Sequence, residues 1–211
     1  MSDADLLAVV TPLTKRSRPR VEYFVSALRR LDAEQVPGAI VECGVWQGAS
    51  LILARTLCPD RQCWGFDTFD GMTAPDEVDG EKALHHYKTK LTDGRKWAAV
   101  SQRVVEDNLR QLGLLDRSKV LFVVGDVKRT LFDDEEPLPD QIALLHLDTD
   151  WYGSTSAALR VLYPRLVPGG VLIIDDFGHW LGARKAVDEY FRGQPVQFER
   201  IDYTGVALVK S

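Results

Sequence analysis

The features that most constrain this chain are two apolar runs that each end abruptly in a pair of carboxylates. Residues 142–148 and 171–176 have the continuous apolar character of strands that are buried on both faces, as in a parallel sheet. Ligands of open α/β sheets bind outside the carboxyl ends of the strands. We therefore expect the acids that end these runs to share one crevice; they are Asp148, Asp150, Asp175 and Asp176.

Four carboxylates in one crevice need a positive charge nearby, because clustered and partly buried charges are costly when nothing neutralises them. A cluster that offers only oxygen ligands suits magnesium or calcium. The alternative interpretation is that these acids cap helices or lie in loops, where Asp is common. The pattern therefore predicts a divalent metal site and leaves a structural role as the alternative.

Strand-like and helix-like segments alternate along the chain, without internal repeats. The predicted strands cover residues 39–44, 62–67, 119–126, 142–148 and 171–176, and the predicted helices cover 18–36, 50–57, 97–112, 154–166 and 182–191. This alternation predicts an α/β fold with a mostly parallel, doubly wound sheet and right-handed crossovers. Two further strands near 196–201 and 205–210 have no helix between them, so we expect an antiparallel hairpin at one edge of the sheet.

The length of 211 residues fits one domain that spans residues 1–211. Within this domain we expect an N-terminal helical segment over residues 1–36. Residues 71–95 are polar and show no clean period. Long loops in compact domains often cover binding sites, so we expect these residues to form a lid loop.

Composition and charge exclude several classes of partner. The net charge of −5, from 26 basic and 31 acidic residues, argues against binding to nucleic acid. No apolar run is long enough for a transmembrane helix, and the N-terminus lacks the pattern of a signal peptide, so we expect no membrane association. Cys43, Cys58 and Cys63 are odd in number and lack zinc-type spacing. Reduced thiols in a cytoplasmic protein are the simplest interpretation.

Glycines and acids at the ends of the first three predicted strands indicate an adenosine-type cofactor. Glycines in the first strand-to-helix turn let a ligand approach the backbone closely. Asp67 ends the second strand, where an acid accepts hydrogen bonds from ribose hydroxyls, and Asp126 ends the third, near the expected adenine. The predicted cofactor-binding residues are Glu42, Gly44, Gly48, Ser50, Asp67, Phe69, Gly125, Asp126 and Asp148.

The first strand-to-helix turn favours S-adenosylmethionine over NAD. It lacks the full G-x-G-x-x-G pattern of dinucleotide sites, and the carboxylate of Glu42 would repel a pyrophosphate. The zwitterionic methionine tail of S-adenosylmethionine tolerates that carboxylate better. We therefore expect Glu42 and Gly44 to lie beside the methionine tail.

Several motifs in one order resemble the macrocin O-methyltransferase (TylF-type) family of sugar methylases from natural-product pathways. They lie at residues 41–50, 67–72, 147–155, 162–164, 168–170, 175–177 and 182–188. The resemblance implies a Rossmann-like class I methyltransferase that uses S-adenosylmethionine and a divalent cation, usually magnesium, to methylate a sugar hydroxyl. It also implies that Asp148, Asp175 and Asp176 are the metal ligands and that Asp150 is the general base.

The proposed chemistry is reasonable on physical grounds. A metal ion can lower the pKa of a coordinated hydroxyl. Asp150 lies two residues beyond Asp148, so both side chains point to the same side of an extended segment, and Asp150 could accept the proton. His179, three residues after Asp176, is a rival base because the ordinary pKa of histidine suits proton transfer near neutral pH.

Alternative functions remain open at this stage. One is a metal-dependent methyltransferase of catechol-type phenols, although that family typically has Asp-Asn where this chain has Asp175 and Asp176. Another is an adenosine-cofactor-binding protein that is not a methyltransferase. For the favoured activity, the substrate is either a nucleotide sugar or a sugar already attached to a natural product. The sequence leaves the oligomeric state open, with a homo-oligomer as one possibility.

Overall fold

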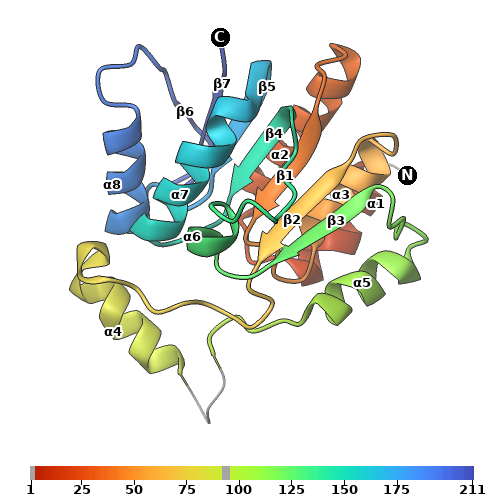
Figure 1. The fold of residues 1–211 in the computed structure, drawn as a ribbon. Helices are drawn as coiled ribbons and strands as arrows, with labels where there is room; N and C mark the ends of the chain where they lie inside the picture. Colours follow the sequence, from red (N-terminus) through yellow and green to blue (C-terminus); the bar gives the residue numbers. More distant parts are fainter. Residues whose placement is uncertain (1–2, 92–95) are drawn as a thin grey trace.

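Seven strands form one mixed sheet in the order β3-β2-β1-β4-β5-β7-β6, in a computed structural model that describes residues 3–91 and 96–211 (Figure 1). Five strands run parallel: β1 (Ala39–Cys43), β2 (Cys63–Asp67), β3 (Val120–Val124), β4 (Ile142–Leu147) and β5 (Leu166–Ile174). The last two, β6 (Glu199–Arg200) and β7 (Val206–Val209), are antiparallel to each other, and β7 inserts next to β5. The predicted α/β class, parallel sheet and antiparallel edge hairpin are therefore confirmed.

Helices cover both faces of the sheet (Figure 1). One face carries α1 (Asp3–Val10), α2 (Arg18–Ala33), α3 (Ala49–Leu57) and α5 (Gln102–Gln111). The other carries α6 (Val127–Thr130), α7 (Tyr152–Leu162) and α8 (Leu181–Tyr190). Short 3₁₀ helices are η1 (Thr11–Leu13), η2 (Glu77–Asp79) and η3 (Tyr163–Arg165). Among the described residues, no helix is both long enough and apolar enough to cross a membrane.

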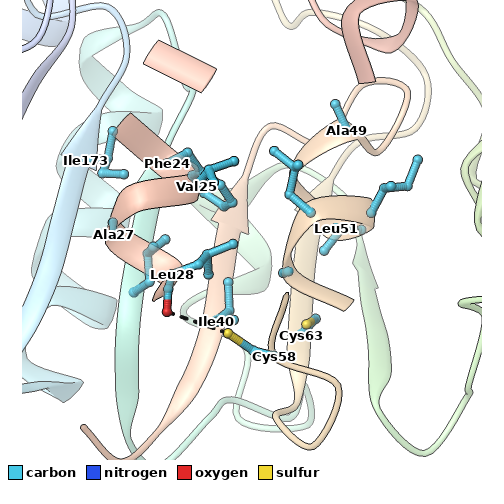
Figure 2. Close-up of a cluster of buried hydrophobic side chains, with 14 of the residues drawn as sticks. Phe24, Val25, Ala27, Leu28, Ile40, Ala49, Leu51, Cys58, Cys63 and Ile173 are labelled. Carbon is cyan, nitrogen blue, oxygen red and sulfur yellow. Dashed lines mark hydrogen bonds between the residues drawn. The ribbon is translucent and has the colours of Figure 1, made fainter. Parts of the chain in front are cut away.

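The sheet is apolar on both faces because successive side chains of its central strands enter different cores. In β1, Ile40 joins the core under α2 and α3, whereas Val41 and Cys43 join the core under α7. Figure 2 shows the first core, where the Cys58 thiol lies 3.8 Å from the carbonyl oxygen of Leu28. All three cysteines are free and buried. Burial raises the pKa of the Cys58 thiol to about 11, so it is protonated at neutral pH.

The lid-loop prediction for residues 71–95 is wrong in part. The structure forms η2 and then helix α4 (Gly80–Lys90) inside this range, while residues 92–95 lie outside the described part of the chain. Figure 1 shows α4 set apart from the sheet, in the long connection that follows β2. Ala83 is the one fully buried residue of this helix. Because so little of α4 is buried, its sequence lacks the apolar stripe by which helices are predicted.

Other predicted boundaries also shift. The helix predicted over 18–36 ends at Ala33, and Gln35 adopts a left-handed φ of 53°. The strand predicted to begin at Val171 begins at Leu166, because Pro168, Gly169 and Gly170 continue the strand through a bulge. Opposite them, Ile142 pairs with Leu166 and Leu144 with Val171. A Pro-Gly-Gly sequence is typical of turns, and only the pairing with the neighbouring strands reveals a bulged strand instead.

Candidate active site

A cavity of about 330 Å³ lies at the carboxyl ends of the parallel strands. It is also lined by residues from the segment before α2 and from the connection that carries α4. The predicted site residues that line it are Glu42, Gly44, Ser50, Asp67, Gly125, Asp126, Asp148, Asp150, Asp175, Asp176 and His179. Residues more than 130 positions apart in the sequence therefore meet in one cavity, as the strand-end pattern predicted.

Two predicted cofactor residues, Gly48 and Phe69, do not line this cavity. Gly48 precedes α3 with a left-handed φ of 86°, and a Cβ atom there would come within 2.7 Å of the Val105 side chain on α5. The ring of Phe69 is buried edge-to-face against Phe122, with centroids 5.5 Å apart. The structure therefore gives both residues packing roles, and their contacts with the cofactor stay predictions.

The four predicted acids lie together, in two overlapping groups of candidate metal ligands. Ligand oxygens of Asp148, Asp150 and Asp176 lie within 4.8 Å of one another. Asp175 groups with Asp148 and the ring of His146. The two strand ends are held side by side, since the Asp175 N–H donates to the Leu147 carbonyl at 2.9 Å. Asp150, the predicted base, is thus as close to the other carboxylates as a ligand would be.

The pKa values in this cluster show how strongly the acids repel one another. Burial, followed by the charges of Asp175 and Asp176, raises the pKa of Asp148 well above its usual value. Burial also raises the pKa of Asp150 to about 7, and a hydrogen bond joins its side chain to that of Asp176. Burial and the Asp150 charge raise the pKa of Asp176 in the same way. A bound cation would reverse these shifts by favouring the ionised carboxylates.

Asp175 differs from the other acids because protein cations already neutralise it. Burial pushes its pKa up, but His146, Arg16 and Arg20 outweigh burial and lower it. Arg20, on the first turn of α2, forms a close ion pair with Asp175 and a second, 3.0 Å long, with Asp202. No local pattern predicts the role of Arg20, because 155 residues separate it from Asp175.

A buried histidine lies between Glu42 at the end of β1 and Asp175 after β5. His146 Nδ1 lies 2.9 Å from Glu42 Oε1, and its Nε2 lies 3.6 Å from Asp175 Oδ1. Burial lowers the pKa of His146, but the two carboxylates outweigh burial and raise it to about 9, so the ring is cationic at neutral pH. Its Nδ1 contact orients the Glu42 carboxylate, and its charge stabilises the ionised form of Asp175.

Two buried carboxylate oxygens in this network accept no hydrogen bond from the described residues: Glu42 Oε2 and Asp175 Oδ1. Buried polar atoms are normally satisfied, so unsatisfied acceptors indicate a missing ligand or ion. An oxygen-only set with spare acceptors fits a divalent cation such as magnesium. The residues therefore fit the metal that the sequence predicted.

Asp67 has a positioning role that the sequence did not predict. Its Oδ2 accepts the N–H groups of Val45 and Trp46 at 2.7 and 3.1 Å, and its Oδ1 accepts the N–H of Phe69 at 2.8 Å. These bonds hold the turn between β1 and α3, where Trp46 adopts a left-handed φ of 48°. Asp126 likewise caps α6 by accepting the N–H of Lys128 at 2.9 Å. Ribose and adenine contacts of these two residues stay predictions.

At position 44 only glycine fits, because the backbone of the neighbouring segment leaves no space for a side chain. It has a φ of 93°, and a Cβ atom there would lie 2.1 Å from the carbonyl oxygen of Asp148. We expect Gly44→Ala to reduce the free energy of unfolding by about 2–5 kcal/mol, because backbone strain and overpacking both contribute. Urea unfolding checks this. Gly113→Ala is the control, since Gly113 has a φ of 69° but open space around it. Equal losses in both variants would contradict the steric explanation.

Aromatic side chains form another part of the cavity wall. Trp97, Trp151 and Trp180 line the cavity with His86, and the Trp151 and Trp180 ring centroids lie 5.2 Å apart. His179 also lines the cavity, with its ring 4.6 Å from that of Trp180. Burial and then the charge of Lys82 lower the pKa of His179, so its ring is neutral at pH 7. His86 comes from the region predicted as a loop and Trp97 from the start of the helix predicted over 97–112, so the sequence did not place them here.

Solved structures identify the class of protein that this fold and site define. The structure of the O-methyltransferase NovP superposes with a TM-score of 0.80 and is 32% identical, over 92% of this chain and 80% of NovP. The strand order and the acid-lined cavity at the strand ends are those of a class I O-methyltransferase. This chain is accordingly an O-methyltransferase.

The family follows from sequence comparison. The model of the macrocin-O-methyltransferase (TylF) family matches residues 10–210, so the chain belongs to that family. It is 36% identical to 8-demethyl-8-(2,3-dimethoxy-alpha-L-rhamnosyl)-tetracenomycin-C 4'-O-methyltransferase of Streptomyces olivaceus, over 92% of this chain and 78% of that relative. It is also 36% identical to demethyldecarbamoylnovobiocin O-methyltransferase of Streptomyces niveus, over 81% of this chain. The chain spans 64% of the length of that second relative.

Proposed function

We propose that this protein transfers the methyl group of S-adenosylmethionine to a sugar hydroxyl of a glycosylated natural product, with the help of a divalent cation. The observation that carries the proposal is the carboxylate cluster of Asp148, Asp150 and Asp176, which shares one cavity with the cofactor-type strand ends. The relatives support the acceptor class, since one is named for methylating a rhamnosyl tetracenomycin. A finished glycoside is therefore favoured over a nucleotide sugar.

The metal is assigned to Asp148, Asp175 and Asp176. When bound, a divalent cation lowers the pKa of an acceptor hydroxyl and fixes its position. Asp148 belongs to both groups of candidate ligands, and Asp175 Oδ1 is an unsatisfied acceptor. Arg20 and His146 hold Asp175 ionised and in place. Asp150 lines the cavity beside these acids and is assigned as the group that accepts the hydroxyl proton.

The aromatic wall is assigned to the acceptor. Trp97, which is only partly buried, offers apolar area to the C–H groups of a sugar ring and to an attached aglycone, and Trp151 and Trp180 pack in the same wall. Both rings are buried, so the wall also excludes water from the cavity. A sugar held between this wall and the acids would present its hydroxyls to Asp150, which converts binding into proximity.

A methyl-transfer assay tests the proposal. The protein is incubated with methyl-labelled S-adenosylmethionine, magnesium and a panel of glycosides, nucleotide sugars and catechols. We expect label in one or more glycosides, because the acids and the aromatic wall together suit a polar ring with an apolar aglycone. Label in catechols alone would favour the phenol-methylating alternative. Label in nucleotide sugars alone would overturn the glycoside assignment.

A further inference from the structure

The side chain of Arg16 contributes a positive charge to the cavity and comes from a segment outside the sheet. It lies between η1 and α2 and lines the cavity. Its Nη2 donates to Ser50 Oγ at 2.7 Å, and its Nε donates to Thr14 Oγ1 at 3.2 Å. The guanidinium also stacks over Phe24, 5.4 Å from the ring centroid. These contacts fix a half-buried side chain in a cavity that the sequence associated only with strand ends.

No ion pair joins Arg16 to a carboxylate within the described part of the chain. Arg20, four residues later, is different because it pairs with both Asp175 and Asp202. The Arg16 charge lowers the pKa of Asp175 from a distance, but the groups that its guanidinium contacts directly are neutral hydroxyls. Guanidinium groups bind carboxylates with strong, charge-assisted hydrogen bonds, so Arg16 is suited to an anionic group of a ligand.

The surroundings of Arg16 match both charges of an amino-acid tail. Ser50 belongs to the first turn of α3, and no side chain caps that helix. Free N–H groups and the helix dipole favour an anion at this point. Glu42 lines the same cavity, and its buried Oε2 accepts no hydrogen bond from the described residues and is suited to a cationic donor.

We propose that Arg16, together with Ser50, binds the α-carboxylate of the methyl donor, while Glu42 Oε2 accepts its ammonium group. This inference rests on the proposed function, in which S-adenosylmethionine is the donor. It makes the segment before α2 a part of the donor site, with Arg16 as a residue that distinguishes ligands by their amino-acid tail. An adenosine ligand without that tail would not contact the guanidinium.

Calorimetry with two ligands tests the proposal. S-adenosylhomocysteine carries the amino-acid tail, whereas 5'-methylthioadenosine has the same adenosine and sulfur without it. We expect Arg16→Gln to weaken S-adenosylhomocysteine about 10- to 100-fold, as expected for the loss of a charge-assisted hydrogen bond. Binding of 5'-methylthioadenosine should stay within about 2-fold. Arg16→Lys should recover part of the loss, because it restores the charge without the planar fork.

Arg18→Gln is the matched control. Arg18 is two residues away and pairs with Glu22 on the surface, so both affinities should stay as in the parent. Equal weakening of both ligands by Arg16→Gln, or of neither, overturns the assignment of Arg16 but leaves the donor in place. If the parent protein binds neither ligand, the proposed donor is itself wrong, and this inference falls with it. Thermal unfolding of each variant shows that a loss of affinity is not a loss of fold.

Discussion

Asp148→Ala is expected to lower turnover by about 100-fold or more while the protein stays folded. Asp148 is common to both groups of candidate metal ligands, and a metal contributes several kcal/mol to the transition state. Its removal also relieves repulsion, since burial and the charges of Asp175 and Asp176 already raise the pKa of Asp148. The unfolding midpoint of the metal-free variant should therefore be at least that of the metal-free parent. Initial rates at saturating donor and thermal unfolding measure the two effects.

Metal removal provides the companion experiment. Excess chelator should abolish turnover of the parent protein, and added magnesium should restore it, because the acid cluster then regains its cation. Asp60→Ala is the control for substitution, since Asp60 is exposed in the turn before β2 and does not line the cavity. Full activity in excess chelator would show that the acids have another purpose.

Asp150→Asn is expected to lower the rate of methyl transfer by about 100-fold or more. The substitution keeps the volume of the side chain but removes the negative charge that accepts a proton. Burial raises the pKa of this carboxyl, and a bound cation would favour its ionised form, which is the form that accepts a proton. Single-turnover kinetics at saturating magnesium isolates the chemical step.

The position of Asp150 inside the cluster makes a second measurement necessary. If Asp150 is the base, the affinity for magnesium should change less than in Asp148→Ala. A large loss of magnesium affinity in Asp150→Asn would instead show that Asp150 is a ligand. His179→Ala should leave turnover within a few-fold of the parent. If the His179 variant loses methyl transfer and Asp150→Asn keeps it, His179 is the base.

Local patterns in the sequence were enough for the architecture and for the position of the site. Apolar runs such as 142–148 and 171–176 predict strands because a strand buried on both faces leaves no place for polar residues. Acids directly after those runs predict a shared crevice, because parallel strands end at the same edge of the sheet. The family motifs near these strand ends could also be recognised in the sequence. The match of the family model over residues 10–210 confirms the family.

Only the tertiary structure shows which charged side chains contact one another and which steric requirement a glycine such as Gly44 meets. Arg16 and Arg20 carry no local pattern, because their partners Ser50 and Asp175 are 34 and 155 residues away. From the sequence, Gly44 was predicted to let a ligand approach the backbone. In the structure, the Asp148 carbonyl, which follows the neighbouring strand, occupies the space beside Gly44. Helix α4 was not predicted because little of its side-chain surface is buried, so its sequence lacks an apolar stripe. Ion-pair partners, steric contacts and aromatic walls depend on distances between remote segments, and these distances exist only once the sheet has formed.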